Sequence, residues 1–435
     1  MPLPSKLSFR KKLIFAMIPL CLLAAGTEVV LRAIDYRSPN ADPYESFVLH
    51  RPLFEARGDL LQTNPSRVNY FRPQEFARKK APGTVRCVVC GGSVTYGYLL
   101  EDPLHQAYPY VLAQQFEKVH PQTRFEIINC GGLAYATYRL VGIIEECLAY
   151  DPDLVIVMSG HNEFLEPRLY ADLLDVKQSF WYESRIVRLI RQWTASRMQQ
   201  DFQLPRTGDE KHMVLASDYI EERFIVRDVA EYESTADHFS RNLGRMIALC
   251  RERGVPIVLC TEASNIRDWA PFQTLPGGSL NVQQVRAELG RVNKLISEGK
   301  HTDALKAATE ILQDDPGSAA FHFLAAKCLD ALGRPAAAKP HYIQARDTDA
   351  FPHRSISLLN NRVRAVAKAE SVPLFDAEDV LMRAARDAIP GFDLFVDQCH
   401  PNPDGHAIIA KGLQSIIESQ VARNPATAPD SIQAH

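Results

Sequence analysis

The chain has little excess charge of either sign, and this absence argues against one large class of partners. Its 49 lysines and arginines nearly balance 52 aspartates and glutamates, which leaves a formal net charge of −3 over 435 residues. Nucleic-acid binding depends on a strong positive field, so we expect no nucleic-acid partner. The sequence also lacks the glycine-rich loop, with its lysine and hydroxyl residue, that cradles nucleotide phosphates.

The sequence contains no complete cluster of metal ligands at metal-binding spacing. Cys87 and Cys90 could form a metal or redox pair, but no second cysteine pair or histidine cluster lies near them. They stand in a β-branched run, where small side chains in a buried strand are the better interpretation. The 9 cysteines are an odd number scattered along the chain, so they do not identify a redox compartment. We expect neither a metal nor an organic cofactor.

One apolar stretch near the N-terminus is a candidate for crossing a membrane. Basic residues between positions 6 and 12 precede the apolar stretch 13–26, which continues to Leu31 after an interruption at Thr27 and Glu28. A basic flank of this kind stays in the cytoplasm. We interpret residues 1–34 as a basic flank and an uncleaved signal-anchor, with the bulk of the chain in the periplasm. A cleaved signal peptide and a buried helix of a soluble protein are the alternatives.

Short apolar runs alternate with helical patterns along the rest of the chain. The strand-like runs are residues 85–90, 125–129, 154–158, 255–260 and 372–376. Continuous apolar runs of this length suit strands covered on both faces, so the pattern predicts an α/β domain with a doubly wound parallel sheet. We assign this domain to residues 81–280 and 351–425, preceded by an extended linker at 35–80 and followed by a tail at 426–435.

Two insertions interrupt this alternation. Residues 166–230 are rich in charge and aromatics, and we interpret them as helical cover, either a lid over a site or structural padding. Residues 281–350 repeat small residues at helix-packing positions after about 34 residues, as tetratricopeptide repeats do. Two such units are too few to stand alone, so we expect them to lean on the main domain. They are either a platform for a protein partner or a structural insertion.

A polar motif follows each of the first three predicted strands, and a fourth precedes the last helix. Ser93 follows the first strand, the block 129–134 follows the second, and Asn162 follows the third. Asp397 and His400 precede the last helix. Loops at the carboxyl ends of parallel strands converge on one crevice, so these residues can meet there. A serine, an imidazole and a carboxylate that meet in this way form a hydrolytic triad.

These four blocks, in this order, resemble the SGNH (GDSL-type) hydrolase superfamily over about residues 84–268 and 355–420. The Asp397–His400 block with its following proline is the most specific part, whereas the serine block reads Gly-Gly-Ser where the family often has Gly-Asp-Ser. With the anchor and the repeats, the chain is similar to a membrane-anchored bacterial subgroup. The resemblance implies a flavodoxin-like sheet and a serine esterase or acylhydrolase that needs no cofactor.

The resemblance and the chemistry assign the same roles. Ser93 is the expected nucleophile, His400 its general base and Asp397 the group that orients the imidazole. The expected oxyanion donors are the backbone N–H of Ser93, a backbone N–H of the second block at Ala134, and the side-chain amide of Asn162. The family usually has glycine where Ala134 stands, and we expect this alanine to serve provided that its φ is negative.

The sequence therefore favours a serine esterase that removes or transfers a short acyl group, such as acetyl, on an alcohol or carbohydrate ester. The alternative is a non-catalytic, membrane-tethered scaffold that binds a protein partner through the repeats. Three other polar residues have structural interpretations. We expect His161 to pack behind the site, His406 to support the terminal loop, and Arg139 to form a salt bridge.

Overall fold

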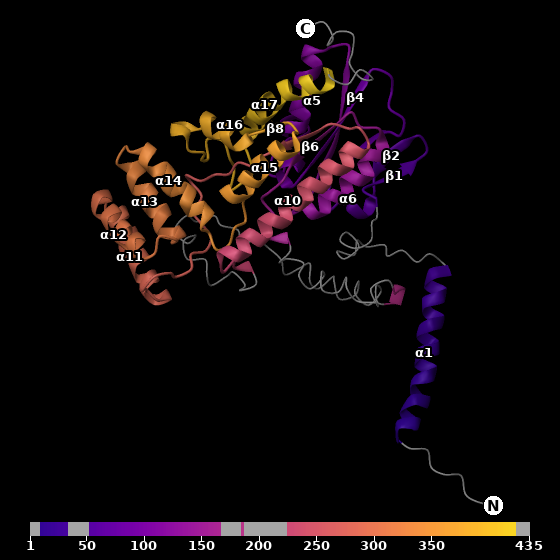
Figure 1. The fold of residues 1–435 in the computed structure, drawn as a ribbon, viewed down its shortest axis with the longest axis horizontal. Coiled ribbons are helices and arrows are strands. Elements are labelled where there is room, and N and C mark those ends of the chain that lie inside the picture. The colour runs from indigo at the N-terminus through magenta and orange to yellow at the C-terminus, as the bar shows by residue number, and fades with distance from the viewer. Residues whose placement is uncertain (1–8, 34–51, 167–183, 187–223, 423–435) are drawn as a thin grey trace, which may run out of the picture. The chain divides into compact units, whose positions relative to one another are not determined.

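The computed structural model describes residues 9–33, 52–166, 184–186 and 224–422, which divide into two units. In the first unit, α1 spans Phe9–Ala33 (Figure 1). Its stretch Phe15–Ala33 is long and apolar enough to cross a membrane, with a mean hydropathy of 1.7 and none of the window buried. By length and composition this stretch fits an anchor or a signal sequence.

A short described part of the first insertion contacts this helix. The Glu28 carboxylate accepts hydrogen bonds from Ser184 Oγ (2.9 Å) and from the backbone N–H groups of Arg185 (2.9 Å) and Ile186 (3.1 Å). The same carboxylate pairs with Arg32 of α1 at 2.8 Å. The remainder of the predicted cover, at 167–183 and 187–223, lies outside the described residues.

The second unit is built on a five-stranded parallel sheet in the order β5-β4-β6-β7-β8. Its strands are β4 (Thr84–Gly91), β5 (Arg124–Gly131), β6 (Leu154–Met158), β7 (Ile257–Cys260) and β8 (Leu374–Phe375). In chain order this is 2-1-3-4-5, the flavodoxin-like arrangement. The predicted fold class is therefore confirmed, and each strand begins or ends within about two residues of its predicted bounds.

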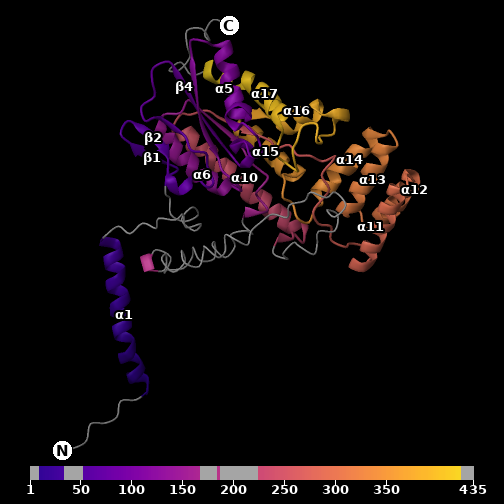
Figure 2. The ribbon, with the colours of Figure 1, turned by 180° about the vertical axis from the view of Figure 1, so that it is seen from behind.

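Helices cover both faces of the sheet (Figures 1 and 2). One face packs against α6 (Thr137–Cys147), α10 (Val229–Glu252) and α15 (Ser357–Glu370), and the other against α5 (Tyr108–Val119), α16 (Ala377–Ala384) and α17 (Pro403–Ala422). Cys90 contributes to the first core and Cys87 to the second. Because side chains alternate along a strand, the two thiols lie on opposite faces and cannot form a pair.

Residues 52–80 are not an extended linker. They form an antiparallel sheet of β1 (Phe54–Arg57), β2 (Leu60–Thr63) and β3 (Glu75–Ala77). Phe54 and Phe76 are buried in the same core as α6, and the Glu146 carboxylate accepts the backbone N–H of Phe54 at 2.9 Å. Strands of three or four residues give almost no periodic signal, so the sequence analysis missed them. The rest of the predicted linker, 34–51, lies outside the described residues.

The second insertion folds as two helix pairs, as predicted. Its helices are α11 (Val282–Ser297), α12 (His301–Asp314), α13 (Ala319–Ala331) and α14 (Pro335–Asp347). A capping box of Asn281 and Gln284 starts α11, which matches the predicted boundary. Tyr342 of α14 lies in one apolar cluster with Phe272 and Phe351 of the sheet domain. The insert therefore leans on that domain instead of standing alone.

Candidate active site

The chain leaves β4 through a turn that only glycine fits. An added Cβ at Gly91 would lie 2.1 Å from Thr95 Oγ1 and 2.3 Å from the Met158 carbonyl oxygen. The short helix α3 (Ser93–Tyr96) begins immediately afterwards, with Gly92 as its N-cap. Ser93 is thus the first helical residue, and its backbone N–H has no partner within the helix. The turn places the hydroxyl and this N–H at the carboxyl edge of the sheet.

The three predicted triad residues meet. Ser93 Oγ lies 2.7 Å from His400 Nε2, although the two residues are 307 positions apart. His400 Nδ1 lies 2.6 Å from Asp397 Oδ2. A carboxylate accepts the Nδ1 proton, which leaves the lone pair of Nε2 to accept the serine hydroxyl. The geometry is that of a nucleophile, a base and a group that orients the base.

Asp397 is held as a carboxylate. Burial disfavours its charged form, but the His400 ring and the backbone N–H groups of Cys399 (2.9 Å) and His400 (2.8 Å) hold the pKa of Asp397 below its ordinary value. The aromatic ring of Tyr98 packs edge-on against the imidazole, with ring centroids 5.1 Å apart. The imidazole is therefore fixed by a charge on one nitrogen and by packing on its ring.

Ala134 adopts the conformation of the glycine it replaces. Its φ is +58°, so the condition of a negative φ set in the sequence analysis is not met. That condition concerns strain only, because the backbone N–H is present at either sign of φ. The neighbouring N–H groups of Gly132, Leu133 and Tyr135 each donate to a backbone carbonyl within 3.3 Å. In the part of the chain that the structure describes, no group accepts the N–H of Ala134. The strained residue is thus the one whose donor remains available.

Asn162 lies against the serine loop. Its Nδ2 donates to the Tyr135 carbonyl at 3.1 Å, which leaves the second amide hydrogen free to donate elsewhere. A Cβ added at Gly92 would come within 3.0 Å of the same Nδ2. The glycine that departs from the usual serine block therefore allows the amide to approach the backbone beside Ser93. Three loops from three strands converge here, as predicted.

Two buried carboxylates hold the Ala134 loop to the segment after Asn162. Glu163 accepts the backbone N–H (2.8 Å) and hydroxyl (2.9 Å) of Thr137, and burial raises the pKa of Glu163 to about 7. Glu166 pairs with Arg139 and accepts the Ala136 N–H, while burial raises the pKa of Glu166 to about 8. The predicted salt bridge of Arg139 is present and stabilises the loop.

The other two histidines near the site have supporting positions. His161 is buried and its Nδ1 accepts the backbone N–H of Ser355 at 2.9 Å. His406 Nδ1 accepts the backbone N–H of Tyr108 at 3.2 Å, and burial together with the nearby His400 lowers the pKa of His406 to about 3. Each accepts a hydrogen bond at Nδ1, and neither is hydrogen-bonded to Ser93.

One group of residues has the composition of a metal site. Ligand atoms of Asp397, Cys399 and His400 lie within 4.8 Å of one another. Both ring nitrogens of His400 are already engaged, by Asp397 and by Ser93. Burial raises the pKa of the Cys399 thiol, which keeps it protonated and a poor ligand. We assign this group to the triad.

The structure adds residues that the sequence analysis did not single out. The backbone N–H of Asn265, in the loop after β7, donates to the Gln398 carbonyl at 3.0 Å and so supports the triad loop. Arg354 in turn donates to the Asn265 carbonyl. The one available signal is position, because the loop after the fourth strand lies on the same sheet edge as the other three.

Comparisons with known proteins bear on the repeats and on the overall chain. A tetratricopeptide repeat model matches residues 295–354. A search of curated proteins found no match. Among solved structures, a GDSL-like lipase from Bacteroides thetaiotaomicron is 12% identical, with 79% of this chain and 92% of that chain covered and a TM-score of 0.34. For a lipase/acylhydrolase from Enterococcus faecalis these values are 13%, 76%, 96% and 0.34.

A two-domain esterase active on acetylated mannans is also similar. It is 13% identical, with 80% of this chain and 52% of that chain covered and a TM-score of 0.33. TM-scores of 0.33–0.34 at identities of 12–13% are too low to support an argument about function. The distances among Ser93, His400 and Asp397 bear on function more directly, because they concern the reacting groups themselves.

Proposed function

We propose that the protein is a serine ester hydrolase of the SGNH type, with Ser93 as nucleophile. The observation that supports this most directly is the hydrogen-bonded series from Ser93 Oγ through the His400 imidazole to the Asp397 carboxylate, with contacts of 2.7 Å and 2.6 Å. A serine hydroxyl is a weak nucleophile until a base takes its proton. This arrangement provides the base.

The proposed reaction has two halves. Ser93 Oγ bonds to the acyl carbon as its proton moves to His400 Nε2, and the ester C–O bond then breaks as His400 protonates the leaving alcohol. Water next attacks the acyl-serine and gives a proton to His400, which returns it to Oγ as the acid leaves. In both halves Asp397 stabilises the imidazolium.

The negative oxygen of each tetrahedral intermediate needs preorganised donors. We propose the N–H of Ser93, the N–H of Ala134 and the free amide hydrogen of Asn162. The unengaged N–H of Ala134 and the position of Asn162 beside Gly92 support this assignment. Each such donor is worth about 10²–10³ in kcat in measured enzymes.

Labelling with a fluorophosphonate probe tests the nucleophile without knowledge of the substrate. We expect the wild-type chain to be labelled and Ser93→Ala to remain unlabelled. Hydrolysis of p-nitrophenyl acetate should fall by at least about 10³-fold in the same variant. A loss of less than tenfold would show that Ser93 is not the nucleophile.

For the substrate we propose a short acyl group, such as acetyl, on an alcohol or carbohydrate. Activity should therefore be higher on p-nitrophenyl acetate than on the octanoate. An added glycan acceptor separates transfer from hydrolysis, because transfer moves the acyl group to the acceptor and hydrolysis releases the free acid. Faster cleavage of the octanoate would contradict the acyl-length proposal.

We also propose that α1 anchors the chain in the cytoplasmic membrane, with the catalytic domain in the periplasm. The apolar stretch Phe15–Ala33 and the basic residues before it support this. The full chain should stay in the membrane pellet after alkaline extraction, and Leu22→Arg with Leu23→Arg should release it. Release of the wild-type chain would contradict an uncleaved anchor.

A second candidate function is partner binding through the repeats, which the match at residues 295–354 favours. It is compatible with catalysis. A partner captured by the full chain should also bind Ser93→Ala, and charge reversal at the exposed Arg291 and Lys294 of α11 should weaken its binding. A partner lost with Ser93→Ala but retained by the charge reversals would be a substrate and not a ligand of the repeats.

A further inference from the structure

We infer that Arg354 and Ser355, where the chain returns from the repeats to the sheet domain, position both catalytic loops. Arg354 supports the triad loop, and Ser355 supports Asn162. The inference rests on the proposed function, because it concerns the geometry of that same site. Both residues are buried, and neither is hydrogen-bonded to Ser93.

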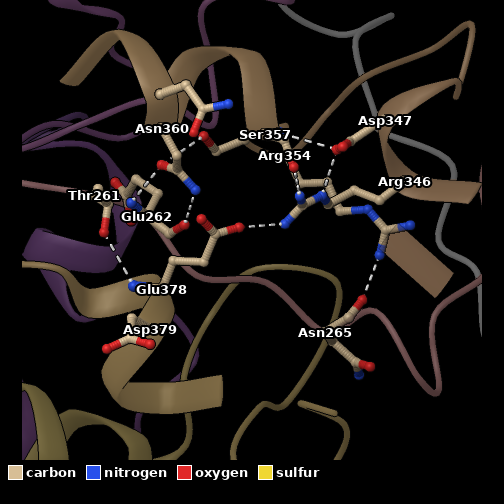
Figure 3. A network of polar contacts seen from close by, with 12 residues as sticks. Thr261, Glu262, Asn265, Arg346, Asp347, Arg354, Ser357, Asn360, Glu378 and Asp379 are labelled. Carbon is tan, nitrogen blue, oxygen red and sulfur yellow. Dashed lines mark hydrogen bonds and ion pairs between the residues drawn. The ribbon is translucent and has the colours of Figure 1, made fainter. Parts of the chain in front are cut away.

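Arg354 donates both of its hydrogen bonds to the loop that follows β7. Its guanidinium donates to the carbonyl of Asn265 (Figure 3). It also donates, at 3.2 Å, to the carbonyl of Trp269, and both acceptors lie in the segment after β7. Its side chain is fully buried, and burial lowers the pKa of Arg354 to about 10, so it remains charged at neutral pH. Among the described residues no carboxylate lies within ion-pair distance of it, and the buried Asp349 favours its charge from further away. A buried charge that contacts only backbone carbonyls fixes the path of that backbone.

The loop that Arg354 holds is hydrogen-bonded to the triad loop. The backbone N–H of Asn265 donates to the Gln398 carbonyl at 3.0 Å, directly after Asp397. Next to it, Ile266 and Arg267 both donate their N–H to the Pro390 carbonyl at 3.0 Å. A displacement of Asn265 would therefore move the carboxylate that orients His400.

Ser355 supports the loop that bears Asn162, one of the proposed oxyanion donors. Its backbone N–H donates to His161 Nδ1 at 2.9 Å, and His161 directly precedes Asn162. The other ring nitrogen, Nε2, lies 3.1 Å from the Glu262 carboxylate. Asn360 holds the Glu262 backbone by accepting its N–H at 2.9 Å and donating to its carbonyl at 2.8 Å (Figure 3). His161 is thus fixed by the hydrogen bond at Nδ1, and its Nε2 lies beside the Glu262 carboxylate without a hydrogen bond.

The neighbouring Arg346 provides a matched control. It ends α14, is as buried as Arg354, and donates to Glu378 (2.8 Å), Asp347 (2.8 Å) and Ser357 (2.6 Å) (Figure 3). These partners lie on α14, α15 and α16 and not on the loops that bear the triad or Asn162. Loss of Arg346 therefore removes a buried charge network of the same junction without touching the catalytic loops.

The first experiment compares Arg354→Met with Arg346→Met in the full chain. Rates of p-nitrophenyl acetate hydrolysis are measured well below each variant's melting temperature, and circular dichroism confirms folding. We expect Arg354→Met to lower kcat by about 10²-fold with KM within about twofold, because a misplacement of about 1 Å has that effect. Arg346→Met should change kcat by less than about threefold. Equal kcat values in the two variants would overturn the role of Arg354.

The second experiment tests the oxyanion side and does not depend on the first. His161→Leu removes the acceptor of the Ser355 N–H, whereas the Oδ1 of His161→Asn can replace Nδ1. We expect the leucine variant to lose about tenfold or more in kcat, with a matching loss of affinity for a boronic acid inhibitor, and the asparagine variant to recover most of both. Leucine and asparagine variants with the same kcat would overturn the role of His161.

The Ser93→Ala variant distinguishes a failure of the proposed function from a failure of the positioning role alone. If this variant retains activity, the proposed function fails. If Ser93→Ala is inactive and the Arg354 and His161 variants behave like Arg346→Met, then the proposed function stands and only the positioning role is wrong.

Discussion

At the scale of single residues, Ala134 combines a strained backbone conformation with an N–H that is proposed to bind the oxyanion. The strain lowers the stability of the fold. An alanine in the left-handed region is less stable by about 1 kcal/mol than in its ordinary conformations. Its φ of +58° persists because the residues on either side are fixed by backbone hydrogen bonds. The position thus has a backbone conformation typical of glycine although its residue is alanine.

Ala134→Gly should therefore stabilise the protein without loss of catalysis. We expect the free energy of unfolding to rise by up to about 1 kcal/mol, because glycine adopts a positive φ without strain. Urea denaturation measures this, with Ala136→Gly as the control. Ala136 has a φ of −100°, so its replacement by glycine should destabilise. An Ala134→Gly variant that lost most of its activity would show that the side chain itself is needed.

Asn162→Ala should act on the transition state alone. The amide is proposed to bind the oxyanion and not the ester ground state, so kcat should fall by about 10²–10³ with little change in KM. Steady-state kinetics with p-nitrophenyl acetate measures both constants. An increase in KM at constant kcat would instead assign Asn162 to substrate binding.

At the scale of elements, helix α17 and the turn before α5 are joined by a histidine that must stay neutral. The Nδ1 of His406 accepts a backbone N–H of Tyr108, and a proton there would remove that acceptor. The pKa of about 3 in the folded protein compares with an ordinary value of about 6.5 in the unfolded chain. Between these values only the unfolded chain binds the proton.

Acid should therefore destabilise this contact. As the pH falls from about 6.5 to about 3, His406 should reduce the free energy of unfolding by up to about 1.4 kcal/mol per pH unit. His406→Gln, whose Oε1 can accept the same N–H, should remove this share of the slope. Denaturation at several pH values compares the two proteins, and other titrating groups cancel in the difference. Parallel slopes would contradict the assignment.

The elements also show what a sequence can predict. The strands β4 to β7 were predicted from short, mostly apolar runs. Ser93, His400 and Asp397 were predicted as a triad from the order of their motifs along the chain and from the family resemblance. Residues 52–80 were not, because their buried side chains, such as Phe54 and Phe76, are widely spaced. Arg354 was missed for another reason: its partners are backbone carbonyls, which leave no trace in residue types.

At the scale of the whole molecule, the repeats and the sheet domain share an apolar core. Tyr342 and Phe323 of the repeats lie in one cluster with Phe272, Trp269 and Phe351 of the sheet domain. A shared core of this kind couples the two parts, so neither can lose its packing without affecting the other. The repeats are therefore a structural part of the catalytic unit.

Tyr342→Ala should consequently destabilise both parts. Removal of a fully buried aromatic ring costs about 3–5 kcal/mol, and we expect thermal unfolding and loss of fluorophosphonate labelling to shift downward together. Leu289→Ala, in the separate core of α11 to α13, is the control. It should lower the stability of the repeats while labelling survives to a higher temperature than in Tyr342→Ala. Labelling unaffected by Tyr342→Ala would show that the two parts unfold independently.

The separation of Ser93 from His400 has a consequence during synthesis. Under the proposed function, the nucleophile Ser93 is synthesised 307 positions before its base His400. The serine hydroxyl should therefore remain unactivated until His400 has been translated and has folded against it. A product truncated before His400 should not hydrolyse esters.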